Sequence, residues 1–526
     1  MAPGAVRQKL PATRAAVRRT SVAALLLAAA LGLQWRSGAY SAALDGFPDE
    51  SGHFLTGLMI RDYVADGFPA GPRTFAERYY VHYPRISFGH WPPLFHLIEA
   101  AWLLVFPVGR GPVLALMALF TAGAAFLVYL FLEKDTGVLV GAWSALLFTA
   151  MPVVREYSAM VMPEGLVALL CLGATCAFAR YLRTEKARDA ALFGVLATLA
   201  ILTKANGWLL AGIPPLAIAA TGKWRLLRKL SFWIPPAIVL PTAGAWYAAT
   251  FETAQQGWTG SINPQFLMSS VFGYNVTAVV RMGGAGILIL ALFGLVVSRR
   301  FAGRDAYVVC AVLALAALVF HSFVAPVRAD RHLITAAPTI AIFAGAGTHW
   351  IAAKLGRFAF VTVVLGAVLF LAGTPDAPPK QRSGLTELAA FLDAQGDLQR
   401  GPVLIHSEFP GAEGAFVAEV AVRDRRRPEY MVVRDSNWLS SATTAGGLLD
   451  EMEAEGIHVL VLDPRGPRRS AEHHLLDEAP PAGPDRALPI WGDAAHIRAY
   501  RLLRALAAPT EKIRLDVRRS LGKILK

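Results

Sequence analysis

The sequence predicts a polytopic α-helical membrane protein, with about 11 spans and interfacial helices in its first external loop, joined to a small C-terminal α/β domain. Hydrophobic residues make up 55% of the 526 residues, mean hydropathy is +0.44, and charged residues reach only 17%. A soluble domain carries about 25% charged residues. The apolar residues also gather in stretches such as 111–132 and 333–352, which are long enough to cross a bilayer core of about 30 Å.

The N-terminal segment, residues 1–19, is basic and precedes the first apolar stretch. A cleaved signal peptide is one interpretation, because small residues follow at 41–43. A retained span over 20–40 is favoured, because the residues after it make sense as its exit loop. In both cases the basic segment forms a cytoplasmic tail, since cations stay on that side of the membrane.

The spans are placed by apolar length and oriented by the charge of their connectors. They are 20–40, 111–132, 137–153, 163–182, 189–203, 207–221, 231–250, 283–298, 305–325, 332–352 and 358–374. Cations gather in alternate connectors, at 180–188, 223–229, 299–304 and 354–357, whereas 251–280 contains none. Because cytoplasmic loops are rich in Lys and Arg, the basic connectors are assigned to the cytoplasm.

The same rule excludes a full span over the apolar segment 93–107, which would turn every later basic connector outward. We therefore expect this segment to be re-entrant or to lie in the outer interface. The predicted domains are then the tail, a transmembrane domain over 20–374 with an external loop at 41–110, and an external domain over 375–526. The protein is assigned to the cell (inner) membrane, with its C-terminal domain external or periplasmic.

The external domain alternates short apolar runs with helical patterns, which is typical of an α/β domain with a parallel sheet. The expected strands and helices are 402–406, 429–433 and 457–462, and 385–392 and 448–455. A basic amphipathic helix is expected over 513–526.

Several function classes lack support in the sequence. The net charge of +13 comes from short loops beside apolar spans, not from a basic face of a soluble domain, so nucleic acid is not an expected partner. The three cysteines lie in apolar stretches without zinc or redox spacing. No Walker A loop, dinucleotide-binding G-x-G-x-x-G or H-E-x-x-H motif is present.

Carboxylates occur at the external ends of two spans. Asp49 and Glu50 directly follow the first span, where they could take a proton from a hydroxyl or hold a metal. Glu164 begins a later span, and Glu156 lies eight residues earlier in the same external turn. Capping of the following helix is the structural alternative, although an ionisable residue at a span is a functional candidate.

Cations on the external side run against the positive-inside bias. Lys204 lies in a tight turn between two spans, Arg331 precedes a late span, and Arg85 and His90 lie in the first external loop. Arg and Lys are natural phosphate ligands. The alternatives are a local pair between Arg331 and Asp330 and snorkelling of Lys204. Together, acids and cations on one face favour a site for a hydroxyl nucleophile and an anionic leaving group.

These motifs resemble those of the C-type glycosyltransferases that use polyprenyl-phosphate sugars, including protein O-mannosyltransferases and lipid A aminoarabinose transferases. The resemblance covers about residues 15–375. The matching motifs are Pro48-Asp49-Glu50, Pro92-Pro93-Leu94 with His90 and His96, Pro163-Glu164, Thr203-Lys204 and Asp330-Arg331-His332.

The resemblance implies a hexosyl- or pentosyltransferase that moves a sugar, with inversion, from a polyprenyl-phosphate donor to a lipid, glycan or protein acceptor. Asp49 would activate the acceptor with Glu50 beside it, and Glu164 would be the second acid. Lys204 and Arg331 would bind the donor phosphate. Further candidates are His90, Arg85, His332, Glu156 and His96.

One departure from the family pattern concerns the phosphate site. Where the aminoarabinose branch has a lysine before Pro-Pro-Leu, this chain has Trp91, so His90 or Arg85 would have to replace that contact. The sequence leaves a divalent metal open. It also leaves two other classes open, a secondary transporter and a non-catalytic membrane anchor for a binding or assembly domain, although no inverted repeat is visible.

Overall fold

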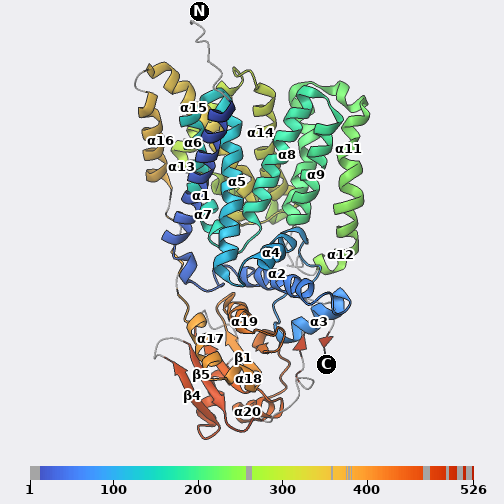
Figure 1. Cartoon of the computed structure of the whole chain (residues 1–526), viewed down its shortest axis with the longest axis vertical. Helices are drawn as coiled ribbons and strands as arrows, with labels where there is room; N and C mark the ends of the chain where they lie inside the picture. Colours follow the sequence, from blue (N-terminus) through green and yellow to red (C-terminus); the bar gives the residue numbers. More distant parts are fainter. Residues whose placement is uncertain are drawn as a thin grey trace, which may run out of the picture.

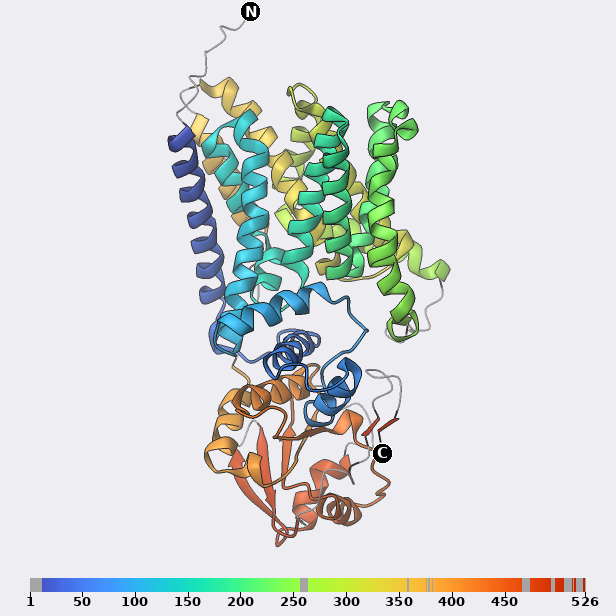
Figure 2. The ribbon, with the colours of Figure 1, turned by 45° about the vertical axis from the view of Figure 1, so that its right-hand side comes forward.

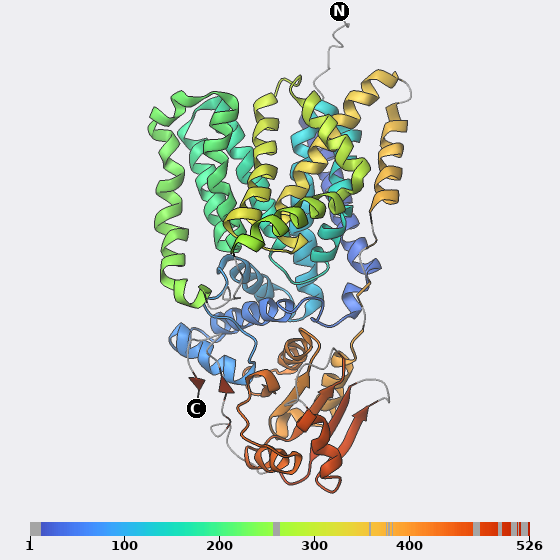
Figure 3. The same cartoon turned by 180° about the vertical axis from the view of Figure 1, so that it is seen from behind.

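The computed structural model of the chain describes residues 12–255, 264–356, 359–374, 376, 379–380, 382–465, 474–492, 497–505, 513, 515–516 and 524–525. A bundle of long helices forms one end of the molecule and a C-terminal α/β unit the other, with α2, α3 and α4 between them (Figure 1). Seen from behind, α16 stands at the edge of the bundle, and the chain runs down from it to the α/β unit (Figure 3).

The first half of the bundle consists of α1 (Ala12–Arg36), α5 (Arg110–Thr136), α6 (Val138–Ala150), α7 (Pro152–Ser158), α8 (Glu164–Thr184), α9 (Ala187–Thr203), η2 (Ala205–Gly212) and α10 (Ile213–Thr221). The second half consists of η3 (Trp224–Arg228), α11 (Leu230–Val239), η4 (Leu240–Gly244), α12 (Ala245–Gln255), α13 (Pro264–Ser298), α14 (Arg304–Val319), η5 (Phe320–Val324), η6 (Asp330–Ala336), α15 (Ala337–Leu355) and α16 (Ala359–Gly373).

Within the described residues, five helices are long and apolar enough to cross a membrane, or six if the bent pair α6–α7 is one span. The remaining predicted spans are shorter or interrupted. The stretch 207–221 is divided between η2 and α10, and 231–250 passes through Pro235, Pro236 and the π-helical segment η4. Proline removes a backbone donor, so such breaks are expected there. The count of about 11 spans stays a prediction.

Small residues allow α13 and α15 to pack at close range. A Cβ added to Gly294 of α13 would lie 1.8 Å from the carbonyl oxygen of Phe343, and one added to Gly347 of α15 would lie 2.6 Å from that of Leu290. Close backbone approach at small residues is the usual way in which apolar helices associate in a bilayer. This crossing therefore depends on glycine at both positions.

The loop over 41–110, which the sequence predicts to be external, contains α2 (Glu50–Ala65), α3 (Pro72–His82) and α4 (Leu94–Val105). With 12 residues, α4 is shorter than a spanning helix, and it lies between the bundle and the α/β unit (Figure 2). It corresponds to the segment 93–107, for which the connector charges excluded a full span.

The C-terminal unit contains α17 (Leu385–Ala394), α18 (Asp397–Arg400), β1 (Val403–Ser407), α19 (Ala412–Arg423), β2 (Val432–Arg434), η8 (Asp435–Asn437), α20 (Ala445–Ala454), β3 (Val459–Asp463), α21 (His474–Ala482), β4 (Ala487–Gly492) and β5 (Arg498–Leu502). Its five strands follow the order β2-β1-β3-β5-β4. β1 pairs in parallel with β2 and β3, with Val403 opposite Val432 and Val459.

The three predicted strands pair in parallel as expected. The whole sheet is nevertheless mixed, because β5, which was not predicted, is antiparallel to both β3 and β4. The β4–β5 hairpin lies at the edge of the sheet, where Leu488 and Pro489 of β4 are exposed, and an edge strand is where a proline can be accommodated. The helix expected over 513–526 is wrong where the structure describes this range, because a short antiparallel pair is found there, β6 (Leu515–Asp516) and β7 (Ile524–Leu525). The rest of the range, apart from residue 513, lies outside the described residues.

The α/β unit and the loop over 41–110 share one hydrophobic core, which joins Tyr79 and Tyr83 of the loop to Phe416 of α19. Buried polar contacts reinforce this interface. Arg427 Nε donates to Asp62 Oδ2 at 2.7 Å, and the Tyr83 hydroxyl donates to a carboxylate oxygen of Asp424. The boundary at residue 375 and the external side of the loop stay predictions, but the loop packs with the C-terminal unit.

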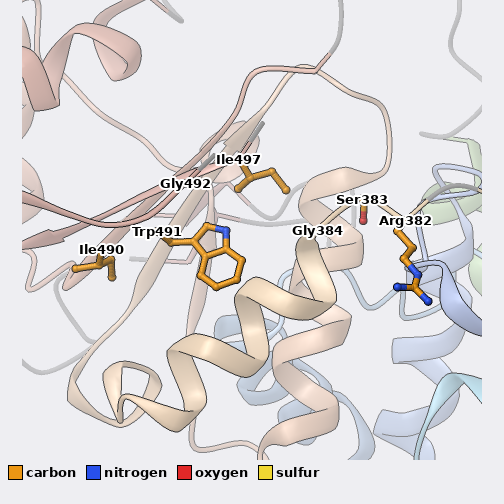
Figure 4. Close-up of a pocket in the computed structure, with 7 residues that line it drawn as sticks. All are labelled: Arg382, Ser383, Gly384, Ile490, Trp491, Gly492 and Ile497. Atoms are coloured by element: carbon orange, nitrogen blue, oxygen red, sulfur yellow. The ribbon is translucent and has the colours of Figure 1, made fainter. Parts of the chain in front are cut away.

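A cavity of about 520 Å³ lies in the C-terminal unit, between the segment that leads into α17 and the β4–β5 hairpin (Figure 4). Trp491 and Ile497 form its apolar wall, and Arg382 lies at its other side. The Trp491 ring packs on Phe391 of α17, with 5.0 Å between ring centroids. The cavity thus offers an aromatic surface and one guanidinium group.

Candidate functional site

Four charged side chains from distant parts of the chain meet where the bundle faces α2. Both terminal nitrogens of Arg331, Nη1 and Nη2, donate to Asp49 Oδ2, at 3.3 and 3.2 Å. Lys204 Nζ donates to Glu164 Oε1 at 2.5 Å, and Arg331 Nη1 lies 3.9 Å from the same oxygen. We call Asp49, Glu164, Lys204 and Arg331 the acid–base cluster.

Each member of the cluster is placed by an element end. Asp49 precedes α2, Glu164 is the first residue of α8, Lys204 directly follows α9, and Arg331 lies at the start of η6. Asp49 is the N-cap residue of α2, yet its side chain makes no capping hydrogen bond. The Asp49 carboxylate therefore does not cap α2.

The structure also differs from the two local alternatives for the cations, which were a pair between Arg331 and Asp330 and snorkelling of Lys204. Asp330 accepts hydrogen bonds from Arg281, at 2.6 and 3.0 Å, and from the Tyr274 hydroxyl at 2.7 Å. Because Asp330 already has these partners, Arg331 pairs with Asp49 instead. Lys204 turns its amino group towards Glu164 instead of extending along the helix surface.

The cluster is mostly shielded from solvent. The side chain of Glu164 is 0% exposed, those of Arg331 and Lys204 are 14% and 15% exposed, and that of Asp49 is 31% exposed. The Arg331 guanidinium also lies 4.0 Å from the centre of the Phe47 ring, a cation–π contact that fixes its plane. Asp49 is thus the most accessible member of the cluster, and its cationic partner Arg331 is held in place.

The cluster retains unused hydrogen-bonding capacity. Among the described residues, Glu164 Oε2 and Arg331 Nε are buried without a hydrogen-bond partner. Both contacts that Arg331 makes with Asp49 go to Oδ2. The second oxygen of Asp49 is therefore the one that can accept from an incoming hydroxyl.

Glu50 lies apart from the cluster although it follows Asp49 in sequence. Its carboxylate is fully buried and accepts from the amides of Gly46 and Val161, each at 3.1 Å, and from Arg110 Nη2 at 3.3 Å. These contacts fix the loop that carries Asp49. The geometry favours a positioning role for Glu50.

Arg85 and His90 do not join Lys204 and Arg331 in one cationic group. Arg85 donates to the carbonyl oxygen of Pro48, and burial lowers its pKa to about 10. His90 packs edge-on against Trp91, with 5.5 Å between ring centroids. Arg85 therefore supports the loop that carries Asp49, through its contact with Pro48.

The other candidates occupy the surroundings of the cluster. His332 Nδ1 lies 3.3 Å from Asn206 Oδ1, and its ring centre lies 5.4 Å from that of His321. Glu156 lies on α7, and His96 lies on α4. In the described part of the chain, no group of three or more His, Cys, Asp or Glu side chains is arranged to hold a metal ion.

Sequence reasoning did not select His53, which lies on α2 one helical turn after Asp49. Its Nδ1 lies 3.0 Å from His96 Nε2, and its ring centre lies 4.1 Å from that of Trp91. The spacing of four residues from Asp49 was the available signal, because residues at i and i+4 share one face of a helix. Trp91, the departure from the family pattern, is the residue that covers His53.

Residues 90–247 match the family model for dolichyl-phosphate-mannose-protein mannosyltransferase. None of the curated protein sequences compared with the chain matches it. Solved structures give longer matches. ArnT from Cupriavidus metallidurans in the apo state aligns with a TM-score of 0.59 at 15% identity, over 93% of this chain and 99% of that chain.

Two further solved structures are similar. The same ArnT bound to undecaprenyl phosphate gives a TM-score of 0.58 at 14% identity, over 92% of this chain and 99% of that chain. The oligosaccharyltransferase of Archaeoglobus fulgidus in the apo form gives 0.51 at 12% identity, over 92% of this chain and 74% of that chain. At these identities the likeness concerns the fold. The resemblance of this chain to the C-type glycosyltransferases that use polyprenyl-phosphate sugars is confirmed, by the family model over residues 90–247 and by the fold over nearly the whole chain.

Proposed function

We propose that the protein is a membrane glycosyltransferase that moves a sugar from a polyprenyl-phosphate donor to a hydroxyl acceptor. The observation that carries this proposal is the acid–base cluster, which combines an accessible carboxylate with two cations at the end of the helical bundle. The match to the mannosyltransferase family model and the ArnT-like fold support the same reaction class.

The reaction that fits this geometry is a direct displacement at the anomeric carbon. Asp49 accepts the proton of the acceptor hydroxyl, a step that contributes about 10²–10⁴ in rate. The acceptor oxygen bonds to the anomeric carbon from the face opposite the phosphate, and the bond from that carbon to the phosphate oxygen breaks. The electron pair leaves with the polyprenyl phosphate, and the configuration is inverted.

Lys204 and Arg331 stabilise the charge that develops on the departing phosphate. Both cations are largely buried, so their electrostatic effect is stronger than it would be in water. Their partners in the present structure are Glu164 and Asp49, which keep the site neutral before substrate binds. Glu164 then holds Lys204 in place beside the phosphate.

The proposed orientation places the cluster on the external or periplasmic side of the cell (inner) membrane. α1 begins at the end of the bundle away from the α/β unit (Figure 2), and Arg18 and Arg19 near its start pair with Glu133 of α5. Such cations mark the cytoplasmic side. About 11 spans then carry the chain to the external α/β domain, with the lipid donor entering from the outer leaflet.

The test of this proposal is transfer of radiolabelled sugar in membranes from undecaprenyl-phosphate mannose and undecaprenyl-phosphate aminoarabinose. We expect transfer by the wild type and about a 100-fold lower rate for Arg331→Gln, because one stabilising donor to the developing charge is lost. Arg73→Gln, which changes an exposed arginine of α3, is the matched control. Folded wild type that transfers sugar from neither donor would contradict the proposal for these two donors.

We expect the reaction to proceed without an added divalent metal. The carboxylates of Asp49 and Glu164 already pair with cations of the chain itself, which supply the charge that a metal would otherwise provide. Transfer rates measured before and after EDTA treatment should agree within about twofold. A loss of activity that Mg²⁺ or Mn²⁺ restores would show that a metal takes part.

A further inference from the structure

Helix α2 begins directly after Asp49 of the acid–base cluster and carries His53 in its first turn. His53 follows Asp49 by four residues, and its backbone amide donates to the Asp49 carbonyl at 2.9 Å, so the helix is already regular between them. One helical turn separates them by about 5.4 Å along the axis. Asp49 and His53 therefore reach two neighbouring points along one face of α2.

The hydrogen-bond partners of His96 determine where the protons of the histidine pair lie. His96 Nε2 faces His53 Nδ1 at 3.0 Å, and the backbone carbonyl of Pro92 is a hydrogen-bond acceptor for the His96 ring that raises its pKa. Because Nε2 faces His53, we assign the contact with this carbonyl to Nδ1. A carbonyl can only accept, so in neutral His96 the proton is on Nδ1 and Nε2 is the acceptor. His53 then donates through Nδ1, and its Nε2 carries the lone pair.

Both rings are held neutral by their surroundings. Burial lowers the pKa of His96 to about 4. Burial, His96 and the cations Lys204, Arg331 and Arg85 all lower the pKa of His53 well below its usual value.

The direction and the lone pair of His53 Nε2 limit the kinds of ligand group that this atom can bind. The two ring nitrogens lie on opposite sides of the imidazole, so Nε2 points away from His96 and α4. A lone pair cannot bind an ionised phosphate oxygen, which is itself an acceptor. A hydroxyl can donate to it, and Trp91 provides an aromatic wall beside it at 4.1 Å between ring centroids.

We propose that His53 is a positioning residue whose Nε2 accepts a hydrogen bond from a hydroxyl of a sugar ring bound beside Asp49, with Trp91 as the wall of that subsite. The inference rests on the proposed function and deepens it. Two substrates could supply this hydroxyl: the sugar of the lipid donor, or a glycan acceptor whose neighbouring hydroxyl reaches Asp49.

The variants His53→Asn and His53→Gln separate this role from a structural one. In His53→Asn the amide nitrogen still donates to His96, but nothing replaces Nε2. In His53→Gln the longer side chain can place a carbonyl oxygen near the Nε2 position. We expect His53→Asn to weaken the affinity for the sugar-bearing substrate by about 10-fold, the value of one hydrogen bond, and His53→Gln to restore part of it.

The experiment uses purified full-length protein and compares binding of bare undecaprenyl phosphate with that of undecaprenyl-phosphate mannose and undecaprenyl-phosphate aminoarabinose. Binding of the bare carrier should be unchanged in both variants, because it has no sugar hydroxyl. Weaker binding of a sugar-bearing donor alone would assign the hydroxyl to the donor. Unchanged donor binding with a raised KM for a glycan acceptor would assign it to the acceptor.

Three results would overturn the inference: unchanged affinity for every sugar-bearing substrate, weaker binding of the bare carrier in His53→Asn, or a fall in kcat alone with a lost limb of the pH–rate profile. The last result would make His53 a proton acceptor in the reaction. The donor-binding measurements need no turnover, so they test the contact between His53 and the donor sugar even if wild-type protein transfers no sugar and the proposed function fails. In that case direct binding of the glycan acceptor to the purified variants replaces its KM, and unchanged binding of both substrates overturns the inference.

Discussion

Replacing Asp49 with asparagine is expected to lower the rate of sugar transfer by about 10²–10⁴-fold, because an amide cannot take the proton of the acceptor hydroxyl. The substitution is nearly isosteric and changes the most exposed member of the acid–base cluster. Arg331 loses its charged partner but remains 3.9 Å from Glu164, so it is not left in the site without any acid. The protein should therefore fold normally.

Initial rates with radiolabelled polyprenyl-phosphate donor would measure this effect, together with binding of undecaprenyl phosphate as a check on the fold. Asp66→Asn is the matched control, since Asp66 is an exposed carboxylate at the other end of α2. Normal transfer by a well-expressed Asp49→Asn protein would rule out Asp49 as the general base and leave only its pairing with Arg331.

The second large effect is expected for Gly294→Ala, which should destabilise the bundle by at least about 3 kcal/mol. The new Cβ would lie 1.8 Å from the carbonyl oxygen of Phe343. A backbone atom cannot move aside as a flexible side chain can, so α13 and α15 would have to separate. Loss of this close approach would remove the packing that holds apolar helices together in a bilayer.

The same helix provides the control. Gly273 of α13 has nothing within 4 Å of an added Cβ, so Gly273→Ala should leave stability unchanged or raise it by up to about 1 kcal/mol through helix propensity. Thermal unfolding of the two variants in detergent would separate the contributions. Equal melting temperatures for Gly294→Ala and wild type would show that α13 and α15 do not pack this closely in the folded protein.

The sequence predicted most where one physical rule acts on a long segment. Apolar length and the charge of connectors placed 93–107 outside the set of spans, and α4 is indeed too short to cross. Alternating apolar runs predicted β1 and β3 almost to the residue. The edge hairpin was missed, because Pro489 interrupts the apolar run of β4 and argues against a strand except at the edge of a sheet.

Individual contacts within the site were less predictable, because they join residues far apart in the chain. The sequence could not decide whether Arg331 pairs with Asp330 beside it or with Asp49, 282 positions away. Arg331 pairs with Asp49 because Arg281 already donates hydrogen bonds to Asp330. Likewise, the sequence predicted only that Trp91 removes a phosphate contact, whereas the structure shows that its ring packs on His53. The catalytic and phosphate-binding roles of these residues stay predictions.

The core shared by the loop over 41–110 and the α/β unit has a consequence for the order in which the protein matures. On the ribosome, Asp62 is made 365 residues before its partner Arg427, and Tyr83 is made 341 residues before its partner Asp424. The Asp49 loop therefore reaches its final packing only after Asp424 and Arg427 have been made. A chain that stops before these two residues would stay inactive in the membrane, with aromatic surface uncovered for quality-control proteases to recognise.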